Sequence, residues 1–460
     1  MLVKPVAIAF LVLLSASMFQ LAVNVQLVRA DIVSSWPMFH NDLAHTGYCS
    51  STGPITNQIL WSYKTGGWVD CNPTVANGIL YVGSNDANVY ALNATTGKLL
   101  WAYKTVAQSV YPAPYTMGSC PTIAGGTLYI GSGETVYALN ATTGTSQWNY
   151  TTYGEMGSSP AVASGVVYVG SGNVEFAFNA TTGSEMWNFT TAQYFWSSAA
   201  VANGMVYVGS DWWDDMVYAL NATTGTVVWS YQTRAGVNSS PAVVNGVVYV
   251  GSDDDNVYAL NAYTGSLVWQ YQTSGPVYSS PAVVGGVVYV GSDNDNVYAL
   301  NATTGALVWE YATGSGVSSS PAIAGGVVYV GSWDDRVYAL NATTGALVWK
   351  YKTGSDVESS PAVAGGIVYV GSEDDKVYAF GLQSQGTSYT LPFVIAIVIV
   401  LAVIALFIVF AVRRGRKREP SDVHAGVSKP PFSIQKAGHA FCYTQYTMSV
   451  PKKARALNRY

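Results

Sequence analysis

The sequence contains one unit of about 40 residues in eight copies, and this repeat restricts the chain to architectures built from similar modules. In the copy from Pro281 to Trp309, short runs of β-branched and aromatic residues alternate with turn signals. The turns are Gly-Gly, Asp-Asn-Asp-Asn and Thr-Thr-Gly. Such punctuation predicts short antiparallel strands. Counting the Trp strand, each unit has four strands, which is the size of one blade of a β-propeller.

Two residue types recur at a fixed position in the repeat and show that it has eight copies. Tyrosine marks one strand of each unit, at Tyr81, Tyr129, Tyr168, Tyr207, Tyr249, Tyr289, Tyr329 and Tyr369. Tryptophan marks another, at Trp61, Trp101, Trp148, Trp187, Trp229, Trp269, Trp309 and Trp349. The first Trp strand precedes the first Tyr strand, and the last unit ends at Phe380 before its own Trp strand. We therefore predict an all-β, eight-bladed propeller over residues 61–380. An arm at residues 31–60 precedes it, and the N-terminal strand completes the last blade, since closure removes open sheet edges.

Charge is distributed unevenly along the chain. Residues 31–390 contain 8 Lys or Arg and 24 Asp or Glu, a net charge of −16. Residues 413–460 contain 11 and 2, a net charge of +9. Such segregation indicates that the two parts lie in different compartments. The acidic part has no basic surface of the kind that nucleic-acid binding requires, so we expect no nucleic-acid partner.

Two apolar segments predict export and a membrane anchor. Residues 1–30 have the pattern of a secretory signal peptide, with an uncleaved anchor as the alternative. After a linker at residues 381–390, residues 391–412 form a run of 22 residues without a charge, long enough for one transmembrane helix. Five Lys or Arg follow directly, which favours a basic cytoplasmic tail at residues 413–460, predicted to be disordered. We expect a single-pass cell-membrane protein whose propeller is extracellular or periplasmic.

The motif Ala-Leu-Asn-Ala-Thr-Thr-Gly-x-x-x-Trp at Ala299–Trp309 occurs with small variations at six other places. It resembles the tryptophan-docking motif of quinoprotein propellers, the repeat family named for pyrroloquinoline quinone (PQQ). In that family the position of Asn301 is usually Asp, Gly305 would make the turn, and the Trp packs between adjacent blades. The resemblance thus implies a docking role for all eight Trp residues. The family includes quinone-dependent dehydrogenases and non-catalytic relatives, such as the scaffold lipoprotein of bacterial outer-membrane β-barrel assembly.

Little in the acidic part indicates catalysis. His40 and His45 are its only histidines and both precede the ring, so a Ser-His-Asp arrangement in the blades lacks its base. The quinone enzymes of the resembled family use PQQ, a calcium ion, a carboxylate base and often a disulfide between neighbouring cysteines. This chain has no adjacent cysteines and no carboxylates that match those calcium ligands. We therefore expect no enzyme, no catalytic or cofactor-binding residue and no cofactor; PQQ and Ca²⁺ belong to the alternative of a quinoprotein oxidoreductase.

Acidic residues concentrate in the turns between the second and third strands of the blades, which share one face of a propeller. The simpler interpretation is that Asp and Asn are favourable turn residues. The functional interpretation is a site for divalent cations or a basic partner, because carboxylate oxygens suit Ca²⁺. The main candidates are Asp214, Asp215, Asp253, Asp254, Asp255, Asp293, Asp295, Asp334, Asp335, Glu373, Asp374 and Asp375. The first three blades contribute mainly Asp86, Glu134 and Glu175.

Aromatic residues interrupt the repeat on the same predicted face. Aromatic side chains beside carboxylates and amides are suited to stacking on sugars or anchoring a peptide. Packing between blades is the alternative. The candidates for binding a protein or glycan partner are Trp68, Tyr194, Phe195, Trp196, Trp212, Trp213, Tyr278 and Trp333.

Two covalent features are compatible with export. Asn149, Asn188 and Asn238 begin Asn-x-Ser/Thr sequences outside the docking motif and are candidate glycan acceptors. Cys71 and Cys120 precede prolines in consecutive blades, and a disulfide between them is our expectation, with Cys49 as the competing partner.

From these features we expect a membrane-anchored propeller that acts as a non-catalytic binding or scaffold module for a protein or glycan partner. A PQQ-dependent oxidoreductase is one alternative. A structural component of the envelope or surface layer is the other.

Overall fold

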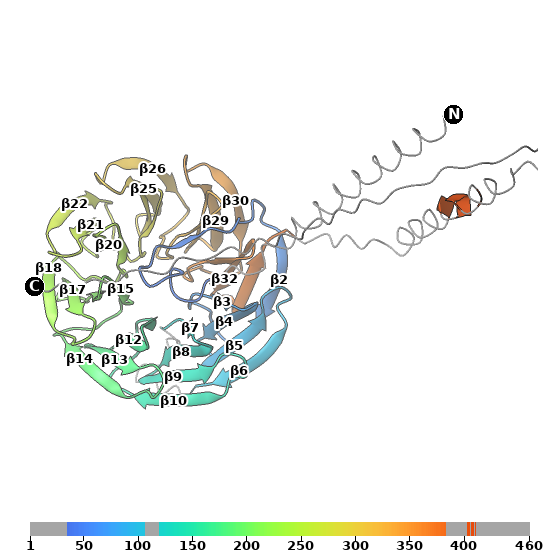
Figure 1. Cartoon of the computed structure of the whole chain (residues 1–460). Helices are drawn as coiled ribbons and strands as arrows, with labels where there is room; N and C mark the ends of the chain where they lie inside the picture. Colours follow the sequence, from blue (N-terminus) through green and yellow to red (C-terminus); the bar gives the residue numbers. More distant parts are fainter. Residues whose placement is uncertain (1–34, 106–118, 383–402, 405, 409, 411–460) are drawn as a thin grey trace, which may run out of the picture. The chain divides into compact units, whose positions relative to one another are not determined.

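The computed structural model describes residues 35–105, 119–382, 403–404, 406–408 and 410. Its main feature is a ring of eight antiparallel sheets, which confirms the predicted eight-bladed propeller (Figure 1). The chain divides into two units, Met1–Ser384 and Gln385–Tyr460, and the ring belongs to the first.

Each blade runs from a three-residue strand at the centre to a longer strand at the rim. The first four blades are β3 (Thr74–Ala76), β4 (Ile79–Ser84), β5 (Asn88–Asn93) and β6 (Leu99–Lys104); β7 (Thr122–Ala124), β8 (Thr127–Ser132), β9 (Thr135–Asn140) and β10 (Ser146–Thr151); β11 (Ala161–Ala163), β12 (Val166–Ser171), β13 (Val174–Asn179) and β14 (Glu185–Thr190); β15 (Ala200–Ala202), β16 (Met205–Gly209), β17 (Met216–Asn221) and β18 (Val227–Gln232). The last four are β19 (Ala242–Val244), β20 (Val247–Gly251), β21 (Asn256–Asn261) and β22 (Leu267–Gln272); β23 (Ala282–Val284), β24 (Val287–Ser292), β25 (Asn296–Asn301) and β26 (Leu307–Ala312); β27 (Ala322–Ala324), β28 (Val327–Ser332), β29 (Arg336–Asn341) and β30 (Leu347–Lys352); β31 (Ala362–Ala364), β32 (Ile367–Ser372), β33 (Lys376–Phe380) and the N-terminal β2 (Ile59–Lys64).

The sixth blade illustrates how the repeat sequence produces this sheet. Gly285 and Gly286 have φ angles of 60° and 78° and make the tight turn between β23 and β24, a conformation that glycine adopts without strain. The middle strands β24 and β25 are buried on both faces because the neighbouring blades cover them. The rim strand β26 alternates between exposed and buried residues, as expected of a half-buried strand.

Adjacent blades are joined through the docking motif. Trp269 Nε1 and the hydroxyl of Tyr249 both donate to the carbonyl of Ala302 in the next blade, at 2.9 and 3.0 Å. Gly305, with a φ of 71°, lies against the Trp269 ring, and a Cβ at this position would be 2.7 Å from ring carbon Cε3. Any larger residue would therefore push the ring away. Ala94, Ala141, Ala180, Ala222, Ala262 and Ala342 accept the corresponding pairs of hydrogen bonds.

The ring closes as predicted. β2 pairs antiparallel with β33, and Trp61 lies opposite Ala379. Trp61 Nε1 then donates to the carbonyl of Ala94 in the first blade at 3.0 Å, so the closing strand docks like every other rim strand. The last blade has no docking turn, and at that junction the carbonyl of Pro54 accepts from Trp349 instead.

The N-terminal arm runs along the central strands of most blades. Trp36 pairs with Val75, and β1 (Tyr48–Cys49) pairs in parallel with β27. Arm carbonyls accept hydrogen bonds from the central-strand N–H groups of Val75, Ile123, Val201, Val243, Val283 and Ile323. These N–H groups form the inner edges of the sheets, which the arm thereby satisfies.

The two histidines of the arm are buried. Burial lowers the pKa of His40 to about 3 and that of His45 to about 4, so both rings are neutral at physiological pH. The His40 ring stacks on Phe39 with centroids 4.5 Å apart. Their contribution is to packing of the arm.

The predicted membrane segments fall mostly outside the described residues. Residues 1–30 and the tail at 413–460 are not described. Within the predicted span at 391–412, only residues 403–404, 406–408 and 410 are described, as helix. In the described part of the chain, no helix has both the length and the hydropathy needed to cross a membrane.

Glu175 departs from the repeat inside the third blade. The other seven blades have Val at this position, for example Val297, and the Glu175 side chain is fully buried. Neither of its carboxylate oxygens has a hydrogen-bond partner. Burial raises the pKa of Glu175 well above its ordinary value. The expectation that Glu175 belongs to the acidic surface is therefore wrong, because it lies in a strand position that faces the next blade.

Replacing Glu175 with the Val of the other blades should stabilise the protein. We expect Glu175→Val to raise the free energy of unfolding by about 1–3 kcal/mol at pH 7, since it removes a buried polar group without a partner. The folded-state pKa lies above the ordinary 4.5, so the penalty grows as pH rises above that value and the gain should shrink toward pH 4. Denaturant titrations at both pH values measure this, with the exposed Glu310→Val as control. An equal gain at both pH values would contradict it.

Removing the closing tryptophan should weaken the ring. We expect Trp61→Ala to lower the free energy of unfolding by about 3 kcal/mol or more, because it removes the contact with Gly97 and the bond to Ala94. Thermal and denaturant unfolding of the full chain provide the measurement. Trp213→Ala is the matched control, since that ring is 85% exposed and its loss should change stability by less than about 0.5 kcal/mol. Equal effects of the two substitutions would refute the closing role of Trp61.

Candidate functional site

The centre of the ring contains a cavity of about 380 Å³. Phe39 from the N-terminal arm lines it, and most other lining residues come from the segments that lead into the central strands. Two rings of side chains, one residue per blade in each, surround this cavity.

The first ring is a closed circle of hydrogen bonds, which we call the girdle. In each blade one backbone N–H donates to the side chain at the equivalent position of the next blade. The girdle side chains are Asn72, Cys120, Ser159, Ser198, Ser240, Ser280, Ser320 and Ser360, and all eight line the cavity. Six of the eight bonds are accepted by serine hydroxyls. A serine oxygen that accepts from the backbone still has its own O–H to donate, so the girdle offers hydroxyl donors to a ligand.

The second ring, the mouth ring, is formed by the residue two positions before the girdle residue in each blade. Its described members that line the cavity are Asp70, Gly157, Trp196, Asn238, Tyr278, Ser318 and Glu358. Almost every one is a different residue type, although the repeats around them are nearly identical. The chemistry of the cavity entrance is therefore set by one variable position per blade.

One group of carboxyls lies where the eighth blade meets the first. Burial and repulsion from Asp70 raise the pKa of Glu358 to about 7. Burial and the charge of Glu358 raise the pKa of Glu373 to about 7, and burial and Glu373 raise that of Asp70 to about 6. Asn85 donates to Asp70 Oδ2 at 2.8 Å, but Asp70 Oδ1 has no hydrogen-bond partner. Burial and the mutual repulsion of these groups thus favour their protonated forms.

A second group lies at the fourth to sixth blades. Asn238 Nδ2 donates to Asp211 Oδ1 and Asp253 Oδ2, at 3.2 and 3.0 Å. Burial raises the pKa of both Asp253 and Asp293 to about 6, and each carboxylate has one buried oxygen without a partner. Asn238 Oδ1 is also without a partner. Oxygen atoms of this kind are the ligands that hard divalent cations prefer.

The arrangement is not a closed metal site. In the described ranges, no group of three or more His, Cys, Asp and Glu side chains is placed to hold a metal ion. A cation at the second group would thus be held by at most two carboxylates, with the Asn238 amide oxygen and ligand or solvent oxygens completing its shell.

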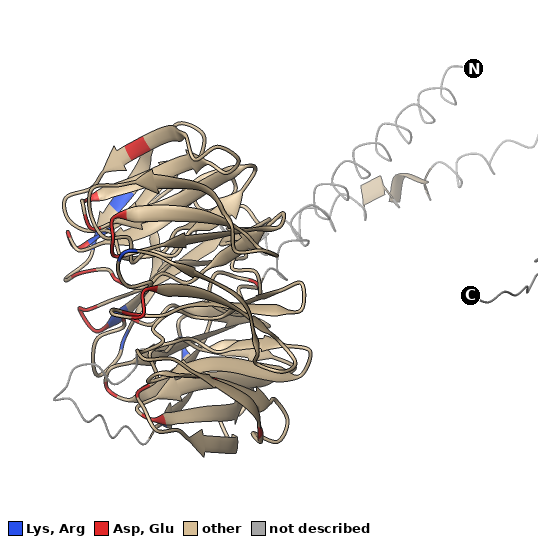
Figure 2. Cartoon of the chain, turned by 90° about the vertical axis from the view of Figure 1, so that its left-hand side faces the viewer, with Lys and Arg blue, Asp and Glu red and all other residues tan. Residues whose placement is uncertain are grey.

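The twelve acidic candidates occupy three successive positions of their turns. Figure 2 shows that most Asp and Glu residues of the ring lie at one side of it. The first-position residues Asp253, Asp293 and Glu373 do not line the cavity themselves, but each interacts with a residue that does. The second-position residues each accept a hydrogen bond from a tyrosine hydroxyl four residues later; they are Asp214, Asp254, Asp334 and Asp374. The third-position residues have positive φ and use their backbone carbonyls to accept from a threonine N–H; they are Asp215, Asp255, Asp295, Asp335 and Asp375. Nine of the twelve therefore have structural contacts of turn residues.

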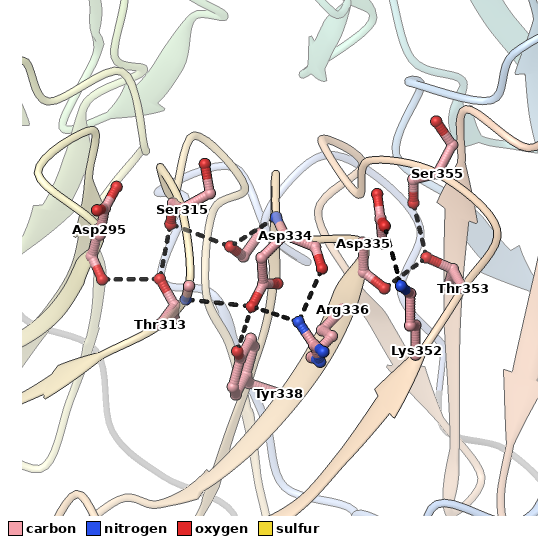
Figure 3. Close-up of polar contacts among 12 residues, drawn as sticks. Asp295, Thr313, Ser315, Asp334, Asp335, Arg336, Tyr338, Lys352, Thr353 and Ser355 are labelled. Carbon is pink, nitrogen blue, oxygen red and sulfur yellow. Dashed lines mark hydrogen bonds and ion pairs between the residues drawn. The ribbon is translucent and has the colours of Figure 1, made fainter.

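The turn at Asp334 shows these structural contacts in detail (Figure 3). Asp334 Oδ2 accepts from the Tyr338 hydroxyl and from Arg336 Nη1, the latter at 3.0 Å. The neighbouring Asp335 forms an ion pair with Lys352 at 3.5 Å. Both carboxylates bind to residues of their own or the adjacent strands, and neither residue lines the cavity.

The aromatic candidates also divide into residues that line the cavity and residues that do not. Trp196 and Tyr278 line the cavity. Trp212 is exposed outside it and donates to Asp253 at 2.6 Å, while Tyr194 and Trp213 are exposed and Trp68 and Trp333 are half-buried. Phe195 is only 1% exposed, so its placement on a binding surface is wrong. It packs on Gly170 at the position where most other blades place a Val against the equivalent Gly, and so belongs to the core.

The candidate glycan acceptors and the candidate disulfide differ in how the structure places them. Asn149 and Asn188 are exposed. Asn238 is a cavity residue whose amide donates to two aspartates, so it is not an accessible glycan acceptor. Cys49, Cys71 and Cys120 are free thiols. The expected disulfide between Cys71 and Cys120 is thus absent from the structure, although Cys120 Sγ accepts a hydrogen bond from Asn72, the residue after Cys71.

Several cavity residues were missed from the sequence. Asp70, Glu155 and Glu358 line the cavity but lie outside the turns in which acidic residues were sought. The Ser-Ser-Pro sequence that recurs before the central strands marks the girdle, and the residue before it marks the mouth ring. Variation at that one position, among otherwise constant repeats, is the signal that could have located the site.

Comparison with known proteins identifies the repeat family. The family model described as outer membrane protein assembly factor BamB matches residues 49–172, 113–193, 132–239, 170–315 and 294–387. The chain belongs to this family of PQQ-like repeat propellers. The membership agrees with the docking motif and confirms the resemblance inferred from it.

Curated relatives match over short stretches. The dehydrogenase subunit of the quinone-dependent alcohol dehydrogenase of Gluconobacter oxydans is 38% identical over 92 residues, which are 17% of this chain and 12% of the relative. Tetrathionate hydrolase of Acidithiobacillus ferrooxidans is 28% identical over 100 residues, 22% of this chain and 17% of the relative. The matched stretches thus span less than a fifth of the length of either relative.

Solved structures share the fold over most of the ring. A europium-containing methanol dehydrogenase superposes with a TM-score of 0.65 at 16% identity, covering 76% of this chain and 98% of the other. BamB from Moraxella catarrhalis gives a TM-score of 0.59 at 20% identity, covering 71% and 99%. The quinohemoprotein alcohol dehydrogenase of Comamonas testosteroni gives 0.64 at 17% identity, covering 76% and 80%. At these identities the likeness concerns the fold.

The comparisons correct the functional expectations. The expectations of a non-catalytic scaffold, of no enzyme and of no cofactor are contradicted, because quinone-dependent alcohol dehydrogenases recur among the matched relatives and similar structures. Between the alternatives considered from sequence, these matches favour the quinoprotein oxidoreductase. The scaffold interpretation depended on the absence of adjacent cysteines and of carboxylates that match the calcium ligands, and these two features do not outweigh the matches.

Proposed function

We propose that the propeller is an oxidoreductase of the quinoprotein type, which oxidises a small alcohol with a PQQ-like o-quinone bound in the central cavity beside a divalent cation. The observation that carries this proposal is the composition of that cavity. It combines oxygen donors without partners, aromatic faces and a carboxyl whose pKa is near 7 in one space of about 380 Å³. The quinone-dependent relatives support it.

The fit of the cofactor depends on charge. PQQ carries three carboxylates, and the described cavity lining includes Asp70, Glu155 and Glu358 but no Lys or Arg. Like charges in a partly desolvated space repel, so the cavity does not fit the quinone alone. A divalent cation at Asn238, Asp253 and Asp293 would neutralise both sides, and these residues have the oxygen atoms without partners that a hard cation takes as ligands. The residues therefore fit a quinone that is bound together with a cation.

The remaining cavity residues have roles in binding and proton transfer. When bound, an o-quinone supplies the acceptor for the two electrons and the carbon-bound hydrogen of an alcohol. Trp196 and Tyr278 place aromatic faces at the cavity, where they would hold a flat ring and exclude water. The girdle serines would donate hydroxyl hydrogen bonds to its oxygens.

Glu358 is the proposed general base. It belongs to the mouth ring, and its charge interacts with that of Asp293, a member of the proposed cation group. A carboxylate there can accept the hydroxyl proton of the alcohol at one of its oxygens. A pKa of about 7 suits a group that accepts a proton near neutral pH.

Reconstitution tests the proposal. We expect the purified full-length protein to bind PQQ and to oxidise alcohols with an artificial electron acceptor only when Ca²⁺ or Eu³⁺ is added. Glu358→Gln should retain the bound chromophore but lower kcat by about 10²–10⁴-fold, the usual contribution of a general base. Asn238→Ala should weaken chromophore binding. Glu310→Gln, exposed on a rim strand, is the control. A folded protein that gives no chromophore and no thermal shift with either cation would disprove the proposal.

We also propose that residues 391–412 anchor the propeller in the cell membrane, with residues 413–460 in the cytoplasm. The charge-free run of 22 residues and the basic residues that follow it support this. Deletion of residues 391–412 should move the propeller from the membrane fraction to the soluble fraction. In intact cells, added protease should digest the propeller and leave a C-terminal tag protected. If the deleted protein still sediments with membranes, or the tag is digested, the anchor is wrongly placed.

A further inference from the structure

Two cysteines interrupt the serine pattern at the junction of the first and second blades. Each blade has a pair of residues before its central strand, and the repeat fills both with serine in the third to eighth blades. Cys71 takes the first position in the first blade, and Cys120 takes the second position in the second blade. Both side chains are buried in the protein yet line the cavity. A small molecule in the cavity would therefore contact both sulfur atoms.

The geometry of the repeat brings these two positions together. Cys71 Sγ accepts from the N–H of Gly83 at 3.3 Å, as Ser239 Oγ accepts from Gly251 in the fifth blade. Cys120 Sγ accepts from the N–H of Asn72, the residue after Cys71, at 2.9 Å. Each cysteine also shifts the pKa of the other, so the two thiols lie close enough to interact. Each sulfur thus keeps the hydrogen bond of the serine it replaces, and the pair spans two blades.

We propose that Cys71 and Cys120 form a redox-active dithiol in the cavity wall, which small cationic disulfides oxidise to a disulfide between the first and second blades. The inference rests on the placement of the two thiols and requires neither the quinone nor the cation. It differs from the expectation of a permanent structural disulfide, because each sulfur of the free thiols already accepts the backbone hydrogen bond of the serine that it replaces.

The exchange proceeds in two balanced steps. The sulfur of Cys120 attacks one sulfur of a disulfide R–S–S–R, so that a Cys120–S–S–R bond forms and a thiolate RS⁻ leaves. The sulfur of Cys71 then attacks Cys120 Sγ, forming the Cys71–Cys120 bond and releasing the second RS⁻. The two thiol protons pass to the leaving thiolates, giving two R–SH. The protein is oxidised by two electrons and the external disulfide is reduced by two.

The hydrogen bonds and the burial of each thiol indicate which of the two attacks the external disulfide. Hydrogen bonds from Cys71, Ser159 and the Asn72 N–H lower the pKa of Cys120 despite its burial. Burial raises the pKa of Cys71 well above its ordinary value. Cys120 is therefore the attacking thiolate, and Cys71 is the resolving thiol.

The charge of the cavity selects the oxidant. Asp70, Glu155 and Glu358 line the cavity, and its described lining contains no Lys or Arg. A cationic disulfide is attracted through this entrance and an anionic one is repelled. The preference must weaken with added salt, because exposed charges are screened.

Thiol exchange on the reduced full-length protein tests the proposal. Cystamine is the cationic probe, 2-hydroxyethyl disulfide the neutral one and 5,5′-dithiobis(2-nitrobenzoate) the anionic one. We expect cystamine to react about tenfold or more faster than the anionic probe at low ionic strength, with a smaller ratio at high salt. Peptide mapping by mass spectrometry should find Cys71 joined to Cys120, and the oxidised protein should melt at a higher temperature.

The variants use residues that the repeat already contains. Cys71→Ser and Cys120→Ser each restore the serine of the other blades, so both should fold. Cys71→Ser should stop at a mixed disulfide on Cys120, and Cys120→Ser should react much more slowly than the native protein. Cys49→Ser, which removes the third described thiol, should react like the native protein. Peptide mapping separates any reaction at Cys442, which lies outside the described residues.

These measurements test the proposal without any assay of enzyme activity. The proposal is overturned if Cys71 and Cys120 never cross-link in the folded protein or do so only in denaturant. It is also overturned if the Cys120→Ser variant is oxidised at the native rate. If either serine variant fails to fold by circular dichroism, the cross-link and the probe order in the native protein still decide the question. Failure of PQQ binding would leave this result unaffected, because the reaction is measured on the protein alone.

Discussion

The ring depends on one carbonyl group in each docking turn. The Ala302 carbonyl accepts from both Trp269 and Tyr249 of the preceding blade, and the Gly305 turn lies flat against the Trp ring. This contact fixes the distance and the angle between neighbouring blades, because it combines two directional bonds with a large apolar contact. Repeated around the circle, the same geometry returns the last blade to the first, where β2 closes the sheet and Trp61 docks like the rest. The cavity is the space that this fixed circle leaves at its centre.

The fold could be predicted from the sequence because the same local structural signals recur in every copy of the repeat. Turn residues, β-branched runs and docking tryptophans agree in every copy, so strand number, closure and blade count followed from their spacing. The departures from the repeat were harder to interpret. Phe195 and Glu175 were both assigned to the surface from the sequence, but their positions in the repeat place both side chains in the core. A repeat position determines where a side chain lies, whereas residue type alone does not.

The acidic residues illustrate the same limit for the site. Acidic residues are most numerous in the turns, and the sequence therefore predicted a site there. Asp334 and Asp335, however, bind a tyrosine, an arginine and a lysine within the blades. Asp253, in an equivalent turn but one position earlier, accepts a hydrogen bond from Asn238, which lines the cavity. A shift of one residue along a turn thus separates a carboxylate that binds only within the blades from one that contacts a cavity residue. Glu358, outside the turns, could be located only once the central strands were placed around the channel.

This division of positions explains how one scaffold can serve different chemistries. The docking glycine and tryptophan cannot vary without disturbing the angle between blades, and each girdle side chain must accept from a backbone N–H, as Ser, Cys120 and Asn72 do. The mouth ring has neither of these constraints, and its residue types differ from blade to blade. Substitutions there change charge, shape and aromatic content at the cavity while the ring stays intact. Low sequence identity to propellers with the same fold is then expected, and the chemistry of this chain is determined mainly by the few residues that differ between its own blades.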